Sequence, residues 1–376
     1  MQTKKKKMLT TGLAVALAAL LLIGGGTFAY LQSASDDVVN EFDANKVQVE
    51  LEETTGGDYN IVPGTTETKD PTVTVDNTVA AYVFVEVTDK TDGLVTYEIA
   101  DGWTKLDGYD GVYYREVAAN ATDNVFSVLK GDKVTYSAEL KNSNMLDANG
   151  TLKTGIELTF KAYAIQKEPF ADAAEAYLGI PISVATGDEF KDALGSVSEG
   201  QTIKLAEDVY IEYTGTHPDG TYDTYITKPN CTIDLNGKTV TVNNNGYVLS
   251  LAGNGITIKN GTITLANTSN TSYPLYVTSG AKDVVIEDVD IVGGIQVIGN
   301  SSATLRNVDI NATVYYDIYL EYKSTVTVES GIFTKAGNKP HIWTATSTDQ
   351  VIVKGGLFDG SETPTYGGNG TVTIEN

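Results

Sequence analysis

The sequence predicts an all-β protein with an N-terminal β-sandwich and a C-terminal parallel β-helix that begins with a short capping helix. Two observations predict the β-helix: a strand pattern that recurs from Thr232 to Asn376, and a second apolar pattern that recurs in phase with it. A third predicts the sandwich, because short alternating strands before residue 170 are separated by Asp-Gly turns.

Each repeat starts with an apolar–x–apolar strand, which a small or amide residue and then Gly or Val follow. The second apolar residue of this strand recurs at Leu235, Ile258, Ile286, Leu305, Val328, Val353 and Ile374. The second strand recurs at Leu249/Leu251, Leu275/Val277, Ile295/Val297, Ile318/Leu320 and Ile342/Thr344. Two strands per period in constant phase predict coils that stack on each other. We expect the polar residues after the first strand to point inward and bond the turns; they are Asn260, Asp288, Asn307 and Ser330.

The pattern over residues 202–376 resembles the right-handed parallel β-helix of the pectate-lyase superfamily. A leucine-rich repeat has a similar period, but its asparagine-and-leucine pattern is missing here and no helix intervenes between the strands.

A capping box marks the start of this region, with Thr186 as N-cap and Glu189 three residues later. Phe190, Ala193, Leu194 and Val197 then fall on one helical face, which would cover the open end of the stack. We therefore divide the chain into a signal peptide (1–30), a β-sandwich (31–166), a linker (167–185) and a β-helix (186–376).

Charge and cysteine content exclude several classes of protein. The 376 residues carry a formal net charge of −23, which becomes −23 − 4 = −27 without Lys4 to Lys7. Such an acidic surface repels nucleic acid, so we expect no nucleic-acid partner. The single cysteine, Cys231, permits no intramolecular disulfide.

Residues 1–30 have the features of an export signal. A basic segment precedes an apolar run from Leu9 to Ile23, and three glycines and a small residue follow it. We predict cleavage by signal peptidase near Ala29 and Tyr30. The alternative is a membrane anchor, but a spanning helix needs about 20 apolar residues and this run is shorter.

Several motifs in fixed order follow the apolar run: Gly24–Tyr30, Ser33–Asp36, Asn40–Phe42, Val47–Leu51, Val62–Gly64, Lys69–Val75, Ala81–Val87 and Phe160–Gln166. In this order they resemble TasA/camelysin-like proteins, which are bacterial substrates of the SipW-type signal peptidase. The resemblance implies a jelly-roll-like sandwich and a secreted protein of the biofilm-matrix type. It does not bring a protease with it, because the two histidines, His217 and His341, lack the context of a zinc motif.

Catalytic candidates are few. Asp290 and Asp309 occupy the same repeat position and would stack about 5 Å apart, and Arg306 is the one arginine after Arg115. A solvated polar edge is the competing interpretation. No cofactor is predicted. Calcium is the one ion considered, at Asp101, Asp107 and Asp110, but each of these precedes a glycine as turn residues do.

The outward positions of the second strand form a better candidate site. If Ile318 and Leu320 point inward, then Tyr276, Gln296, Tyr319 and Trp343 face outward on successive coils, and Asp317 and His341 flank them. Aromatic rings beside acids and amides predict a platform for sugar rings. The alternative is aromatic packing between coils or against the N-terminal domain.

These patterns predict a secreted cell-surface or matrix protein with a structural or adhesive role rather than an enzymatic one. The β-helix face is the candidate site for a polysaccharide or cell-surface glycan. We also expect self-assembly by strand addition, since the strand at Val47–Leu51 lies near a free end. The alternative function is a polysaccharide lyase or glycoside hydrolase acting on acidic polysaccharide.

Overall fold

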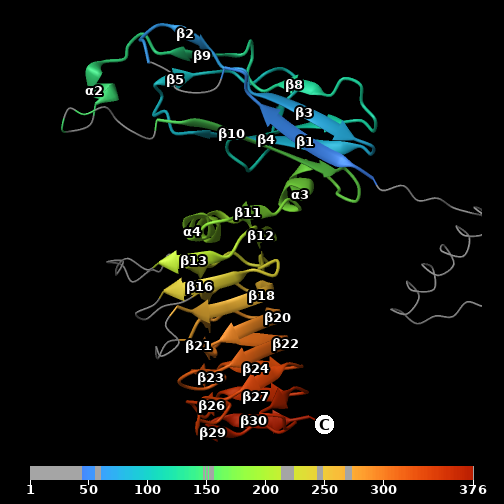
Figure 1. Ribbon diagram of the computed structural model, residues 1–376, viewed down its shortest axis with the longest axis vertical. Helices are drawn as coiled ribbons and strands as arrows, with labels where there is room; N and C mark the ends of the chain where they lie inside the picture. The colour runs from blue at the N-terminus through green and yellow to red at the C-terminus, as the bar shows by residue number, and fades with distance from the viewer. Residues whose placement is uncertain are drawn as a thin grey trace, which may run out of the picture. The chain divides into compact units, whose positions relative to one another are not determined.

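The computed structural model describes residues 45–55, 61–146, 149, 151, 156–212, 224–243, 249–266 and 273–375 (Figure 1). The fold is mostly β, with small antiparallel sheets followed by a parallel β-solenoid, which confirms the predicted fold class. The predicted signal peptide and its cleavage region at Ala29 and Tyr30 lie outside the described residues.

Three small antiparallel sheets form the N-terminal part, in the strand orders β1-β3-β8, β10-β4-β7-β6 and β2-β9-β5. Their strands are β1 (Val47–Glu52), β2 (Thr66–Thr68), β3 (Thr72–Asn77), β4 (Ala81–Asp89), β5 (Val95–Thr96), β6 (Thr104–Lys105), β7 (Val112–Val117), β8 (Val125–Ser127), β9 (Lys133–Tyr136) and β10 (Leu158–Gln166). A short helix, α2 (Asn142–Met145), precedes β10.

Strand β4 is buried on both faces, although simple alternation predicts one buried face. On one face Val83 and Val85 join the core between the sheets. On the other, Phe84 packs against Tyr177 of helix α3 (Ala173–Leu178), with ring centroids 5.3 Å apart. Helix α3 lies within the segment predicted as a linker, and it covers the second face of β4.

The solenoid has two long parallel sheets, one of 13 strands and one of seven, and its coils follow one another from yellow to red in Figure 1. The 13-stranded sheet contains β11 (Ile182–Val184), β12 (Thr202–Leu205), β13 (Val209–Glu212), β15 (Thr232–Asp234), β16 (Thr239–Asn243), β18 (Thr257–Leu265), β20 (Val284–Val292), β22 (Ser302–Asn311), β24 (Thr325–Val328), β25 (Ile332–Thr334), β27 (Gln350–Val353), β28 (Leu357–Phe358) and β30 (Thr371–Ile374). The seven-stranded sheet contains β14 (Tyr225–Ile226), β17 (Leu249–Leu251), β19 (Leu275–Val277), β21 (Ile295–Ile298), β23 (Ile318–Glu321), β26 (Ile342–Thr344) and β29 (Tyr366–Gly368).

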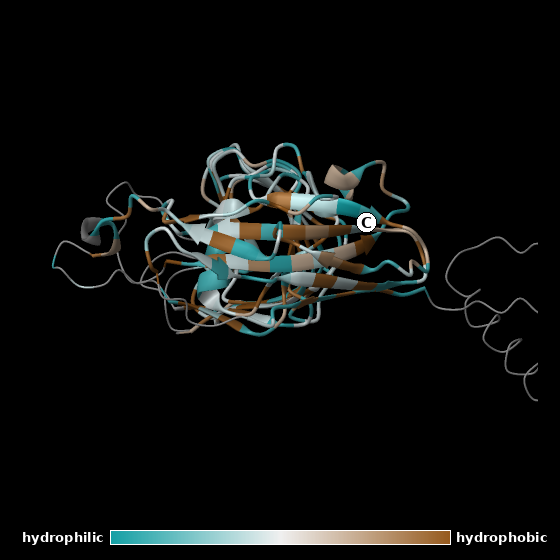
Figure 2. Ribbon diagram, turned by 90° about the horizontal axis from the view of Figure 1, so that it is seen from above, coloured by the Kyte–Doolittle hydropathy of each residue, from teal (hydrophilic) through white to brown (hydrophobic). Residues whose placement is uncertain are grey.

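The register of the coils follows the predicted repeat with one difference. Ile258 and Ile286 lie side by side as expected, but the neighbour of Ile258 on the preceding coil is Ile233, not Leu235. Ile233 and Leu235 are two residues apart, so their side chains point to the same face of the strand. Both are fully buried. Apolar and polar residues alternate along several of the strands that Figure 2 shows from above.

The polar residues after the first strand do not point inward as predicted. Asn260, Asp288 and Asn307 have φ values of 61°, 54° and 49° and are exposed. They still connect neighbouring coils, because the side-chain amide of Asn307 donates to Oδ1 of Asp288 at 2.7 Å. Their left-handed backbone explains why amide and acid residues occupy this bend.

Helix α4 (Gly187–Ser196) forms with the predicted capping box between Thr186 and Glu189. It buries Phe190, Ala193 and Leu194 in the solenoid core. The sheet, however, begins before this helix, because β11 pairs in parallel with β12. The Ile182-Ser-Val184 pattern is the sequence signal of this strand.

Candidate functional site

The predicted outward column lies in register across four coils of the seven-stranded sheet. Tyr276 pairs with Gln296, Gln296 with Tyr319, and Tyr319 with Trp343. Their inward neighbours, such as Ile318 and Leu320, are fully buried, while the four column residues are half-buried. The alternation of each strand therefore places these side chains on one outer face.

Further rings extend this column into what we call the aromatic surface, which consists of Tyr273, Tyr276, Tyr315, Tyr316, Tyr319 and Trp343. Tyr316 lies between two column residues, with its ring centroid 5.1 Å from Trp343 and 6.1 Å from Tyr319. The ring planes differ by 13° and 20°, so the rings stack. The ring centroid of Tyr273 lies 5.9 Å from that of Tyr319 and 6.4 Å from that of Tyr276. Tyr273 therefore contacts both of these column residues.

Sequence reasoning missed Tyr273 and Tyr316 because both lie in the segments before the strands, where alternation does not apply. The adjacent pair Tyr315-Tyr316 was the available signal. Neighbouring rings stack and cover part of each other's faces, which is what the alternative of aromatic packing between coils expects. The rings other than Tyr273 nevertheless remain half-buried, so each offers part of its surface to solvent.

One cation lies at the aromatic surface. The Lys339 ammonium is 5.8 Å from the ring centroid of Tyr315 and 5.9 Å from that of Tyr316. Rings attract such a cation through their negative faces. Burial and the neighbouring Glu321 carboxylate raise the pKa of the Tyr319 phenol, so that its hydroxyl stays protonated. The surface therefore combines apolar ring area, phenol hydroxyls and one positive charge.

Asp317 and His341 do not flank this surface as predicted. Asp317 is fully buried and His341 is 1% exposed. Both precede a strand of the seven-stranded sheet, where the chain turns between the sheets, and strand alternation does not extend into that turn. They are buried polar groups of the solenoid corner and are not accessible to a ligand.

The buried corner is a proton-sensitive part of the solenoid. Burial raises the pKa of the Asp317 carboxyl to about 8, and Asp359 adds to the shift. The backbone N–H of Ala312 lowers the pKa of Asp317, but by less than burial raises it. This N–H already donates to the carbonyl of Thr334 at 2.9 Å. Neither carboxyl oxygen of Asp317 has a hydrogen-bond partner of good geometry.

His341 lies in the same corner, against the ring of Phe358. Its Nδ1 accepts a hydrogen bond from the N–H of Thr365 at 3.1 Å, so the ring proton belongs on Nε2. Nε2 lies 3.5 Å from Oδ2 of Asp359, which also pairs with Lys335 at 2.8 Å. Burial lowers the pKa of His341, so the imidazole is neutral near pH 7.

Two of the three weak catalytic candidates, Asp309 and Arg306, have structural partners. Asp290 and Asp309 are neighbours in register, as predicted. Oδ1 of Asp309 accepts the N–H of Ile332 at 2.8 Å, and the guanidinium of Arg306 binds Glu329 at 2.7 Å. These contacts hold the coils together and leave Arg306 bound to glutamates rather than to the aspartate pair.

Within the described ranges, no group of three or more His, Cys, Asp or Glu side chains is placed to hold a metal ion. In the acidic turn considered for calcium, the Asp110 carboxylate is paired with Lys105 at 3.1 Å. Among the same described residues, no helix is long and apolar enough to cross a membrane.

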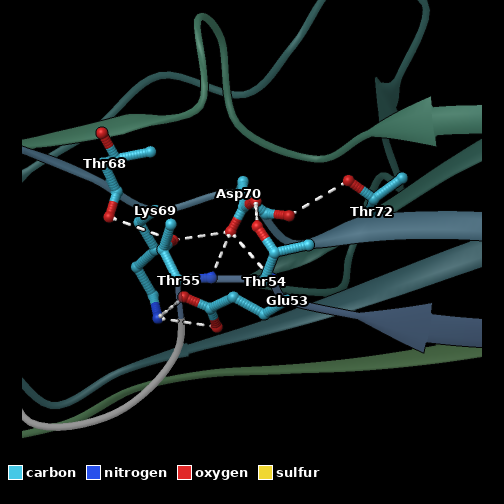
Figure 3. Close-up of polar contacts among 7 residues, drawn as sticks. All are labelled: Glu53, Thr54, Thr55, Thr68, Lys69, Asp70 and Thr72. Atoms are coloured by element: carbon cyan, nitrogen blue, oxygen red, sulfur yellow. Dashed lines mark hydrogen bonds and ion pairs between the residues drawn. The ribbon is translucent and has the colours of Figure 1, made fainter.

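A polar network joins the end of β1 to the start of β3 (Figure 3). Oδ1 of Asp70 accepts the N–H groups of Thr54 and Thr55, each at 3.1 Å, and both threonine hydroxyls also donate to its carboxylate. Beside it the largely buried Lys69 ammonium pairs with Glu53 at 2.9 Å. The Lys69-Asp70-Pro71 motif thus fixes the C-terminal end of the first strand.

Comparison with known proteins identifies the N-terminal part. Residues 4–95 match the model of the camelysin metallo-endopeptidase family. The chain therefore carries a camelysin domain, of the TasA-like type, followed by a β-solenoid region. No curated protein matches the chain.

One solved structure shows a remote similarity, the catalytic unit of a thermostable GH87 alpha-1,3-glucanase from Streptomyces thermodiastaticus strain HF3-3. The two chains are 11% identical over 87% of this chain and 95% of that one, with a TM-score of 0.15. A score of this size carries no argument about fold or activity.

Proposed function

We propose that this chain is a secreted bacterial matrix-type protein that contacts glycans through its aromatic surface. The camelysin family implies a secreted bacterial protein, and the family domain supports a matrix-type role. The observation that carries the glycan proposal is the register of Tyr276, Gln296, Tyr319 and Trp343 on successive coils. A rigid scaffold places three aromatic side chains and one amide on coils that are about 4.8 Å apart, which a polymer of sugar rings can follow.

The chemistry of the surface favours a carbohydrate over a small apolar ligand. Rings offer apolar area to the C–H faces of sugars, and the amide of Gln296 and the phenol hydroxyls offer hydrogen bonds. Lys339 adds one positive charge, which suits a glycan that carries carboxylates. The half-buried state of the rings limits the entropy that they lose on binding.

The experiment is a glycan array with the parent chain and with Tyr319→Ala and Trp343→Ala. Each substitution removes one ring of the column in the aromatic surface, and we expect loss of most binding. Tyr210→Ala is the matched control, because Tyr210 is an exposed ring on β13 outside the surface. Unchanged binding in both Tyr319→Ala and Trp343→Ala, or no binding by the parent chain, would contradict the proposal.

We also propose that the matrix forms by strand addition. Among the described strands, β1 lies at the edge of its sheet, where its partner is β3. An edge strand near a free end can pair with the sheet of a neighbouring molecule. The parent chain should form a ladder of polymers on a gel, and a variant that lacks residues 30–51 should not. A ladder that persists in this variant would count against strand addition.

A further inference from the structure

The outward face of the 13-stranded sheet carries a column of charges that change sign at every coil. We call it the charge ladder, and its eight members are Lys204, Asp234, Lys259, Glu287, Arg306, Glu329, Lys354 and Glu375. Sequence reasoning did not find it, because the register at Asp234 was shifted by two residues.

The strand register places these eight residues in one column. Lys204 pairs with Asp234, Asp234 with Lys259, Lys259 with Glu287, and Glu287 with Arg306. The last three follow directly after paired strands, and their N–H groups continue the ladder of backbone hydrogen bonds. These bonds run from Glu329 to Leu305, from Lys354 to Val328, and from Glu375 to Val353, each at 2.8 Å.

Within one chain the alternation stabilises the stack. Coils lie about 4.8 Å apart, so equal charges in one column would repel each other. Arg306 shows the favourable case, because its guanidinium lies 2.7 Å from Glu329 on one side and 3.9 Å from Glu287 on the other. These pairs are half-exposed and are available to a further partner.

A second column on the same face is flat and weakly polar. We call it the β-branched ladder, and its members are Thr202, Thr232, Thr257, Val285, Thr304, Thr327, Ile352 and Thr373. The first seven are half-buried and Thr373 is exposed. Short branched side chains on a regular sheet form a surface that another flat surface can cover without gaps.

The charge ladder is complementary to itself. It has eight members of alternating sign, so a copy in the reverse order has the opposite charge at every level. A two-fold axis that lies in the interface, perpendicular to the solenoid axis, produces this reversal. Lys204 of one copy then faces Glu375 of the second copy, and Glu287 faces Arg306. The β-branched ladders of the two copies face each other in the same arrangement.

The charge of this face also favours a second copy. Four cations and four carboxylates give the ladder no net charge, whereas the chain carries −23. Two such acidic chains repel each other over most of their surfaces, and the two ladders add no net charge to that repulsion. Seven intervals of about 4.8 Å give a length of about 34 Å. Two columns of this length cover about 500 Å² on each copy, which is near the lower limit of a specific interface.

We propose that the charge ladder and the β-branched ladder form an isologous interface with a second copy of this chain in antiparallel orientation. This contact is separate from strand addition through β1 and joins molecules side by side. Because its pairs are half-exposed, salt weakens it.

The test is sedimentation velocity on the purified chain over a range of protein and salt concentrations. The parent chain should form a dimer at low salt that dissociates as salt increases. The decisive variant combines Arg306→Glu, Glu329→Lys, Lys354→Glu and Glu375→Lys, which leaves the net charge unchanged. Within one chain this variant keeps the alternation of charge except at one step, where Glu287 is followed by the new glutamate at position 306. Between two copies it places equal charges at every level, and we expect the dissociation constant to rise about tenfold or more.

Two controls separate the interface from effects on folding. Glu287→Arg combined with Arg306→Glu disturbs the alternation within the chain, but keeps opposite charges between the copies, so the dimer should persist. A second reversal variant combines Lys204→Glu, Asp234→Lys, Lys259→Glu and Glu287→Lys. It should not form its own dimer, but should form a mixed dimer with the first reversal variant.

A parent chain that stays monomeric at low salt overturns the proposal. So does a dimer that the first reversal variant forms as well as the parent, or a dimer that disappears when residues 30–51 are removed, since that contact belongs to strand addition.

Discussion

Gly367 lies beside Trp343 on the next coil, and a Cβ atom on Gly367 would come within 3.0 Å of the indole ring. On its other side the indole stacks on Tyr316 at 5.1 Å. The glycine therefore leaves the space that lets Trp343 lie against the sheet. The backbone of Gly367 is not in the left-handed region, so a side chain at this position causes no backbone strain. Its one close contact is with the indole ring of Trp343.

Gly367→Ala should displace the indole from Tyr316. The added methyl group is closer to the ring than an ordinary contact, and the half-buried ring can tilt outward. We expect a shift of Trp343 fluorescence, measured in a Trp103→Phe background that leaves one tryptophan. Gly195→Ala is the control, because a methyl group there meets nothing within 4 Å. An identical emission spectrum in the Gly367→Ala protein would refute the packing role of this glycine.

Asp317→Asn should remove a pH dependence of stability. The pKa of Asp317 is raised to about 8 in the folded chain, above its ordinary 3.8. The folded state thus keeps a proton that the unfolded state has lost, and stability falls as pH rises from about 4 to about 8. The slope is at most about 1.4 kcal/mol per pH unit.

The measurement is urea unfolding between pH 7 and pH 8. His341, whose pKa is lowered by burial, destabilises the fold only as pH falls below its ordinary 6.5, so it does not contribute in this range. The hydrogen bond from Lys335 lowers the pKa of Asp359, so Asp359 stays ionised throughout this range. The parent chain should lose stability over this range and the Asp317→Asn variant should not. Asp290→Asn, at an exposed position of the 13-stranded sheet, should behave like the parent. Parallel pH curves for all three proteins would be inconsistent with a buried neutral carboxyl.

The sequence predicted the stack and most of its register because the repeat is a local pattern. Each apolar–x–apolar pair fixes which residues point inward, so Tyr276, Gln296, Tyr319 and Trp343 could be placed on one face without a structure. The same reasoning failed at Asp317 and His341, because both lie in turns between the sheets. Alternation of side chains is a property of strands and gives no direction for a residue outside them.

Contacts between distant segments were also beyond prediction. Helix α3 covers the second face of β4, and the sequence of β4 does not indicate which segment packs against it. The charge ladder needed the correct register at Asp234, where Leu235 competed with Ile233 as the inward residue. A shift of two residues keeps the buried face apolar and therefore leaves no trace in the hydrophobic pattern.

Phe333→Ala should destabilise the solenoid strongly. Phe333 and Phe358 stack on adjacent coils with centroids 4.6 Å apart, and both are almost fully buried. Loss of such a ring leaves a cavity and costs about 3–5 kcal/mol. Urea denaturation measures the change, and Ile332→Ala is the matched control because the neighbouring Ile332 is 49% exposed. Equal losses at the two positions would mean that the ring pair does not support the core.

Asp70→Asn should loosen the end of β1 and favour strand addition. Hydrogen bonds from Thr54 and Thr55 lower the pKa of the Asp70 carboxyl to about 2, below its ordinary 3.8. The folded state therefore favours the ionised form, and this contribution is present above about pH 4 and is lost as pH falls through about 2. An amide at this position retains one acceptor oxygen and carries no charge, so it holds the two backbone N–H groups less well.

Hydrogen exchange of the peptide that spans β1 measures this loosening at neutral pH. Exchange at Thr54 and Thr55 should become faster in the Asp70→Asn variant, and the polymer ladder should form at lower protein concentration. Asp110→Asn is the control, because Asp110 pairs only at the surface with Lys105 in the same domain. If exchange in β1 matches the parent while Asp70 is changed, the strand is held by its pairing with β3 and not by this carboxylate.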